Sequence, residues 1–100
     1  MSYKLFDFRM NDGSRNFMDL PTNIIGWSDL YDYLGKLDGV KNTGFLTDNV
    51  TEVWMDFSFR GQDFSVNNEM GEYWFFAENP NCPEEILIKI AEHCEKLLEK

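Results

Sequence analysis

Residues 53–76 decide the fold, and they read VWMDFSFRGQDFSVNNEMGEYWFF. From Val53 to Phe59 every second residue is apolar. This period of two is typical of a strand with one buried face. Gly61 can supply the positive φ of a tight turn, and Gly71 follows a second polar stretch. We therefore expect three consecutive antiparallel strands in this region.

The pairing of these strands follows from placing apolar residues opposite apolar residues. A two-residue turn that ends at Gly61 places Phe57 opposite Phe64. A four-residue turn that ends at Gly71 then places Phe64 opposite Phe75. A slip of one residue would move Phe64 to the polar face, so the pattern disfavours it.

The three strands present two faces of different character. One face is apolar and is predicted to form the core: Met55, Phe57, Phe59, Phe64, Val66, Tyr73, Phe75 and Ala77. The other mixes charged side chains with aromatic rings: Trp54, Asp56, Ser58, Arg60, Asp63, Ser65, Asn67, Glu72, Trp74 and Phe76. This mixed face either lies under the first helix and the N-terminal segment, in a three-layer domain, or is an exposed patch for a protein partner. The first interpretation is favoured because Trp27, Leu30 and Leu34 also need a surface to pack on.

The rest of the chain supplies further strands and two helices. We expect a strand over residues 3–10 and a turn at Asp12 and Gly13, and a returning strand over residues 17–20 stays open as an optional element. A helix is predicted over residues 27–37 with Ser28 as its N-cap, followed by a loop over residues 41–49.

A second helix is predicted after Pro83, and its apolar stripe should cover Phe57, Phe64 and Phe75. The fold class is therefore α+β, with a mainly antiparallel sheet of four to five strands and two helices in the order β(β)αβββα. The chain is expected to form a single α+β domain over residues 1–100.

The charge of the chain restricts its partners. The formal net charge is −9, and residues 51–100 carry 11 acidic against 4 basic side chains. A field of this sign repels nucleic acid and anionic membranes, and it suits a basic partner or serves solubility alone. The sequence has no apolar run as long as a membrane span and no signal-peptide pattern at Met1, so we expect a cytoplasmic protein.

The sequence offers no recognisable catalytic or metal-binding constellation, and no cofactor is predicted. The one histidine, His93, is predicted to be exposed, and it points away from Cys94 on a helix, so the two do not form a metal pair. Cys82 and Cys94 lie too far apart along that helix for a disulfide. Cys82 is expected to be the more accessible thiol.

The carboxylates of the mixed face are also candidates for an active site. Asp56, Asp63 and Glu72 share this face, and paired carboxylates can act as acid and base in glycoside hydrolysis. A flat sheet in so short a chain offers little cleft, and Arg60 is close enough in sequence to pair with Asp63. They are therefore predicted to be solvated surface charges.

The favoured function is protein binding through the mixed face, with a basic protein as the partner. The candidate residues are Trp54, Asp56, Arg60, Asp63, Glu72, Trp74 and Phe76. In size, acidity and lack of catalytic groups the chain is similar in kind to small cytosolic bacterial immunity proteins and antitoxins, a likeness of composition. Two alternatives stay open: a small enzyme or ligand-binding domain that uses the acidic residues, and a homodimer joined through Trp54 and Trp74.

Overall fold

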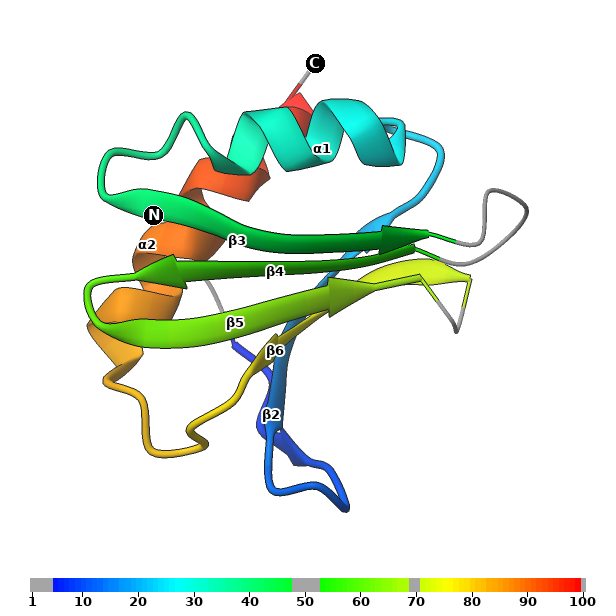
Figure 1. The fold of residues 1–100 in the computed structure, drawn as a ribbon. Coiled ribbons are helices and arrows are strands. Elements are labelled where there is room, and N and C mark those ends of the chain that lie inside the picture. Colours follow the sequence, from blue (N-terminus) through cyan, green and yellow to red (C-terminus); the bar gives the residue numbers. More distant parts are fainter. Residues whose placement is uncertain (1–4, 48–52, 69–70, 100) are drawn as a thin grey trace.

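The protein is built on one antiparallel sheet, seen in a computed structural model that describes residues 5–47, 53–68 and 71–99 (Figure 1). Within these residues the sheet has six strands in the order β1-β2-β6-β5-β4-β3, so the α+β class is confirmed and the predicted count of four to five is too low. The strands are β1 (Phe8–Arg9), β2 (Arg15–Pro21), β3 (Val40–Thr47), β4 (Val53–Phe59), β5 (Gln62–Asn67) and β6 (Glu72–Ala77). The helices are α1 (Trp27–Leu34), α2 (Glu84–Glu95) and a 3-10 turn, η1 (Lys96–Glu99).

Both helices pack on the same face of the sheet. Figure 1 shows α2 crossing behind β3, β4 and β5, and α1 running along β3 at the sheet edge. Leu30 and Leu34 of α1 and Leu87 and Ile90 of α2 are fully buried in one cluster with the predicted core face. The shortest dimension of the molecule, 22 Å, fits one sheet and one helix layer. The favoured three-layer arrangement is therefore wrong, because α1 finds its apolar surface on the side already covered by α2.

The first hairpin of the core has the predicted register. Phe57 lies opposite Phe64, and their rings stack with centroids 5.2 Å apart. The turn residues Arg60 and Gly61 both have positive φ, 53° and 79°, as a two-residue turn of the I′ type requires.

The second hairpin differs from the prediction by two residues. Val66 lies opposite Phe75, and Phe64 lies opposite Ala77, so the predicted Phe64–Phe75 pair is wrong. A shift of two keeps every side chain on its predicted face, and the whole predicted core face is buried. The connection is longer than expected: Asn67 pairs with Trp74.

The predicted loop over residues 41–49 is also wrong for the part that the structure describes. Val40–Thr47 forms strand β3, which pairs along the whole of β4. A bulge between Asn42 and Gly44 shifts the register within this strand. A bulge breaks the alternation of apolar and polar residues, which explains why the pattern was not recognised as a strand.

The remaining elements match the predictions in position but not in extent. Of the strand predicted over residues 3–10, only Phe8–Arg9 is in the sheet, and residues 3 and 4 lie outside the described part. The possible returning strand is confirmed as part of β2. Helix α1 begins after Gly26, without a side-chain cap from Ser28, and ends at the C-cap Gly35 instead of reaching residue 37.

A buried arginine joins the N-terminal segment to α2. Arg15 is 6% exposed, and its guanidinium donates to the carbonyl oxygen of Phe6 at 2.7 and 2.9 Å and to the Glu84 carboxylate at 2.8 Å. Glu84 lies in the first turn of α2, where a carboxylate also suits the helix dipole. The contact fixes β2 and the chain before it against the start of α2.

His93 is partly buried and the two cysteines are buried. His93 is therefore not exposed as predicted: its ring stacks on Tyr33 of α1, and its Nε2 bonds the Tyr33 carbonyl oxygen at 2.7 Å. Both cysteines are free and buried, and Cys82, at 4% exposed, is slightly more accessible than Cys94 at 0%, which is the predicted order. Burial raises the pKa of the Cys94 thiol to about 12.

Candidate functional site

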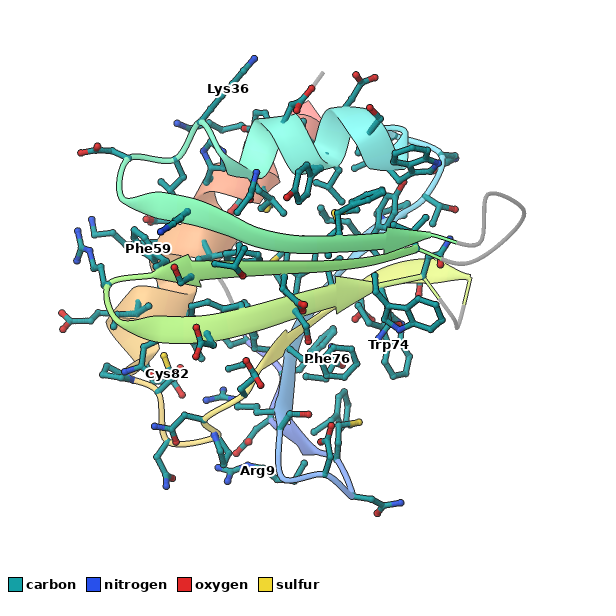
Figure 2. The ribbon with its side chains drawn as sticks, in the orientation of Figure 1. Arg9, Lys36, Phe59, Trp74, Phe76 and Cys82 are labelled. Carbon is teal, nitrogen blue, oxygen red and sulfur yellow. The ribbon has the colours of Figure 1, made fainter. Side chains whose placement is uncertain are left out.

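The face of the sheet away from the helices carries a groove of about 910 Å³. The predicted mixed face forms its base, with Trp54, Trp74 and Phe76 partly buried and Asp56 exposed. Figure 2 shows Trp74 and Phe76 as neighbours, on the side of β6 that lies away from α2, and their ring centroids are 6.3 Å apart. Among the described residues no helix covers these rings, which decides between the two interpretations of this face in favour of the open one.

The groove follows the register of the three central strands. On this face Ser65 of β5 lies between its cross-strand neighbours Asp56 of β4 and Phe76 of β6. One step along the strands, Asn67 lies in the same way between Trp54 and Trp74. Strand β5 therefore carries the small side chains and forms a low floor, and β4 and β6 carry the large ones. The two flanking strands are about 10 Å apart, twice the usual strand spacing.

Two further segments border the groove. The turn between β1 and β2 contributes Met10, Asn11, Asp12 and Ser14. The opposite edge strand β3 borders the groove at Phe45, whose ring packs against Trp27 and Tyr31 of α1. Asp12 accepts hydrogen bonds from the backbone and hydroxyl of Ser14, at 2.9 and 2.7 Å, which lower the pKa of its carboxyl. These bonds keep the turn compact and Asp12 ionised.

The charge of the groove is negative. Asp12, Asp56 and Glu78 line it, and none of its described lining residues is basic. The carboxylate of Asp56 leans over the backbone of β3, where Gly44 leaves room: a Cβ at position 44 would lie 3.1 Å from Asp56 Oδ2. In the described part of the chain the ion pairs involve Asp7 and Glu84, so neither Asp56 nor Glu78 is neutralised by a base. A cation brought into the groove therefore meets the carboxylates of Asp56 and Glu78, which form no ion pair within the described residues.

Two further carboxylates, Asp19 and Glu72, lie near Trp74 on this face. Asp19 of β2 lies opposite Trp74, and its burial raises the pKa of its carboxyl, with a further rise from the charge of Glu72. Asn16 opposes this shift by donating to Asp19 at 3.3 Å. The indole Nε1 of Trp74 is buried and finds no hydrogen-bond acceptor in the part of the chain that the structure describes. Burial of the Asp19 carboxylate and of the Trp74 N–H, which lacks an acceptor among the described residues, therefore costs free energy of folding.

The seven residues predicted for the site are not all brought together by the fold. Trp54, Asp56 and Phe76 line the groove, and Trp74 stands beside Phe76. The others lie outside it: Asp63 is exposed on β5 and Glu72 lies opposite Pro21 of β2.

Arg60 also lies outside the groove. It occupies the β4–β5 turn, and its guanidinium lies 5.1 Å from the centroid of the Phe59 ring. The expected Arg60–Asp63 ion pair is not among those of the described residues.

Several groove residues were missed from the sequence. Asp12 belongs to a turn that was recognised, but nothing in its own sequence indicates that the turn reaches the mixed face. Phe45 lies in the loop predicted over residues 41–49, and Glu78 lies just beyond Ala77, the last residue that the alternation places on a face. The signal for Glu78 was available, because it follows Trp74 and Phe76 at intervals of two.

The described residues contain no group of three or more His, Cys, Asp or Glu side chains placed to hold a metal ion. Nor does that part of the chain include a helix whose length and apolar character would let it cross a membrane. A scan against protein-family models, a search of curated proteins and a search of solved structures each found no match.

Proposed function

We propose that this protein binds a basic protein partner through the open face of its sheet. The observation that carries the proposal is the groove on that face, in which partly buried aromatic rings stand beside Asp56 and Glu78, two carboxylates that no base of the described residues neutralises. Aromatic side chains at the centre of an interface supply most of its binding energy, and charge complementarity guides the partner to it. No catalytic residue is proposed.

The role suggested by composition is inhibition of the partner. Small acidic immunity proteins and antitoxins are the class that the sequence is similar to in kind, and a cytoplasmic location is part of the same proposal. A toxin gene beside this gene would favour that role. The alternatives differ in what would cover the open face. A homodimer would bury the Trp54 region of two copies against each other, whereas a basic partner would cover it with Lys and Arg side chains.

The proposal is tested by site-specific photocrosslinking in the cells that make the protein. A photoreactive amino acid replaces Ser65, on the floor of the groove, and in a matched control it replaces the exposed Glu92 of α2, on the opposite side. We expect a discrete adduct with one basic protein from position 65 and none from position 92. The adduct should be lost when Trp54→Ala is added, while the circular dichroism spectrum stays that of the folded protein.

Other results contradict the proposal in distinguishable ways. Adducts of equal yield from both positions mean that the open face is not selective. An adduct of twice the chain mass means that a second copy occupies the groove. Absence of any adduct from position 65, with the folded protein present at normal level, means that this face has no protein partner.

A further inference from the structure

We propose that the groove takes an arginine side chain carried on an extended segment of the partner, an inference that rests on the proposed function and specifies its chemistry. The argument starts from the layout of β4, β5 and β6. The floor along β5 is made of small polar residues, Ser65 and Asn67, and the flanking strands rise about 10 Å apart. That width admits one extended chain or one long side chain, but not a helix with its side chains, which needs 10–12 Å for its own diameter.

The two ends of the groove differ in chemistry. At one end Trp54 lines the groove beside Asn67, and Trp74, on the far side of Asn67 in the strand register, lies next to the lining. At the other end Glu78 follows β6, and its backbone N–H donates to the Asp63 carbonyl at 3.1 Å, so its side chain lies next to the acidic end of β5. Phe76 and Asp56 stand between the ends, on either side of Ser65. An aromatic end and an acidic end in one groove match a side chain with a flat, cationic head.

Arginine fits this layout better than lysine does. Its guanidinium is planar, stacks on aromatic faces and is more weakly hydrated than an ammonium group. Stacked against Trp54 or Phe76, it can still donate two parallel hydrogen bonds in its plane to Asp56 or Glu78. The lysine ammonium can satisfy the carboxylates but gains less from the rings. A neutral isostere keeps the shape and loses the charge.

The probes are three acetylated, amidated pentapeptides, Gly-Gly-X-Gly-Gly, in which X is arginine, lysine or citrulline. Each is titrated into the ¹⁵N-labelled full chain at low salt and followed by two-dimensional NMR. For the arginine peptide we expect shifts confined to the Trp54 indole and the amides of Ser65 and Asn67. Its binding should be about fivefold tighter than that of the citrulline peptide, as expected for one exposed charge interaction near 1 kcal/mol, with lysine between the two.

Two variants of equal net charge separate local recognition from general attraction. Asp56→Asn removes a carboxylate inside the groove, and Glu92→Gln removes one on the exposed side of α2. We expect Asp56→Asn to weaken binding of the arginine peptide by about fivefold and Glu92→Gln to weaken it by less than twofold. Gly44→Ala keeps every charge but displaces the Asp56 carboxylate, and it should weaken the peptide as well.

Equal binding of the arginine and citrulline peptides overturns the inference, as does an equal effect of Asp56→Asn and Glu92→Gln. Failure here is distinguishable from failure of the proposed function. If position 65 still crosslinks to a partner but the peptides show no preference for arginine, the groove binds a protein by other contacts. If the arginine peptide binds selectively but no protein crosslinks, the groove recognises arginine in a different ligand and the proposed function is wrong.

Discussion

Asp19 shows how a single side chain reports on the open face. It lies on β2 opposite Trp74, and burial and the nearby Glu72 both raise the pKa of its carboxyl above the ordinary 3.8. A raised carboxyl pKa means that the folded state binds the proton more tightly than the unfolded state does. The contribution of Asp19 to stability is therefore lost as the pH rises from about 4 through its folded pKa.

Asp19→Asn should remove this loss. At pH 3.5 the carboxyl is largely protonated in both states, so the variant and the parent should have similar free energies of unfolding. At pH 7 the variant should be the more stable, since its amide oxygen can still accept from Asn16 and no charge has to be buried. Urea denaturation at the two pH values measures the difference. A stability change of the same size at both pH values would show that the ionisation of Asp19 plays no part.

At the scale of elements, Tyr33 of α1 and His93 of α2 join the two helices. The Tyr33 hydroxyl donates to the His93 carbonyl oxygen, and His93 Nε2 bonds the Tyr33 carbonyl oxygen. Because a carbonyl can only accept, Nε2 must carry the proton. The rings stack with centroids 4.1 Å apart. Short α1, at eight residues, would be marginal alone, so this contact helps to hold it on the sheet.

Removal of either partner should loosen α1 by a predictable amount. Tyr33→Phe deletes one hydrogen bond and should lower the free energy of unfolding by about 0.5–1.5 kcal/mol. His93→Ala should cost more, because the ring stack and the Nε2 bond are both lost. His93→Gln is the matched control, since it keeps a donor but not a ring. Chemical denaturation followed by circular dichroism gives the three values, and equal stability of all variants would contradict a role in joining the helices.

The elements also show what the sequence could and could not predict. Alternation of apolar residues assigns each side chain to a face, so the core face of β4–β6 was predicted residue by residue. The same alternation is unchanged by a shift of two, and for that reason the Phe64–Phe75 pair was wrong although both rings are in the core. The bulge in β3 interrupts the alternation there, so the sequence pattern predicts a loop where the structure has a strand.

The site was predicted in part for the same reason. Trp54, Asp56 and Phe76 alternate with core residues and could be placed on one face from their spacing alone. The turn that carries Asp12 and the edge strand that carries Phe45 join the groove through contacts between segments far apart in sequence. Likewise, an apolar stripe such as Leu30 and Leu34 predicts that a helix is packed, but not on which side of the sheet.

At the scale of the whole molecule, the buried core lies on one side of the sheet and the groove proposed to bind a partner lies on the other. Phe64→Ala removes a fully buried ring that contacts Phe17 and Phe57, and it should lower the free energy of unfolding by about 3–5 kcal/mol. Trp54→Ala, on the open side, should cost clearly less and instead weaken the complex by about 2 kcal/mol or more. Parallel unfolding and binding titrations check both, and global unfolding of Trp54→Ala would place that ring in the core.

The net charge of −9 should speed the association of a basic partner by long-range attraction. Between about 50 and 500 mM salt the screening length falls from about 14 to about 4 Å, so attraction of a basic partner to the groove should weaken steeply. We expect the association rate to fall by tenfold or more over this range, with a smaller change in the dissociation rate. Stopped-flow mixing with the crosslinked partner measures both rates, and a rate indifferent to salt would contradict electrostatic attraction.

The one-sided core has a consequence for how such a protein can change. Along β4, β5 and β6 the residues that face the helices alternate with those on the open face. The same stretch of chain therefore determines both the core and the open surface, through different residues. Under the proposed function, substitutions at every second position would change the partner that the groove binds, while the positions between them would still form the same core. Descendants of this chain can therefore diverge quickly in what they recognise and remain alike in shape.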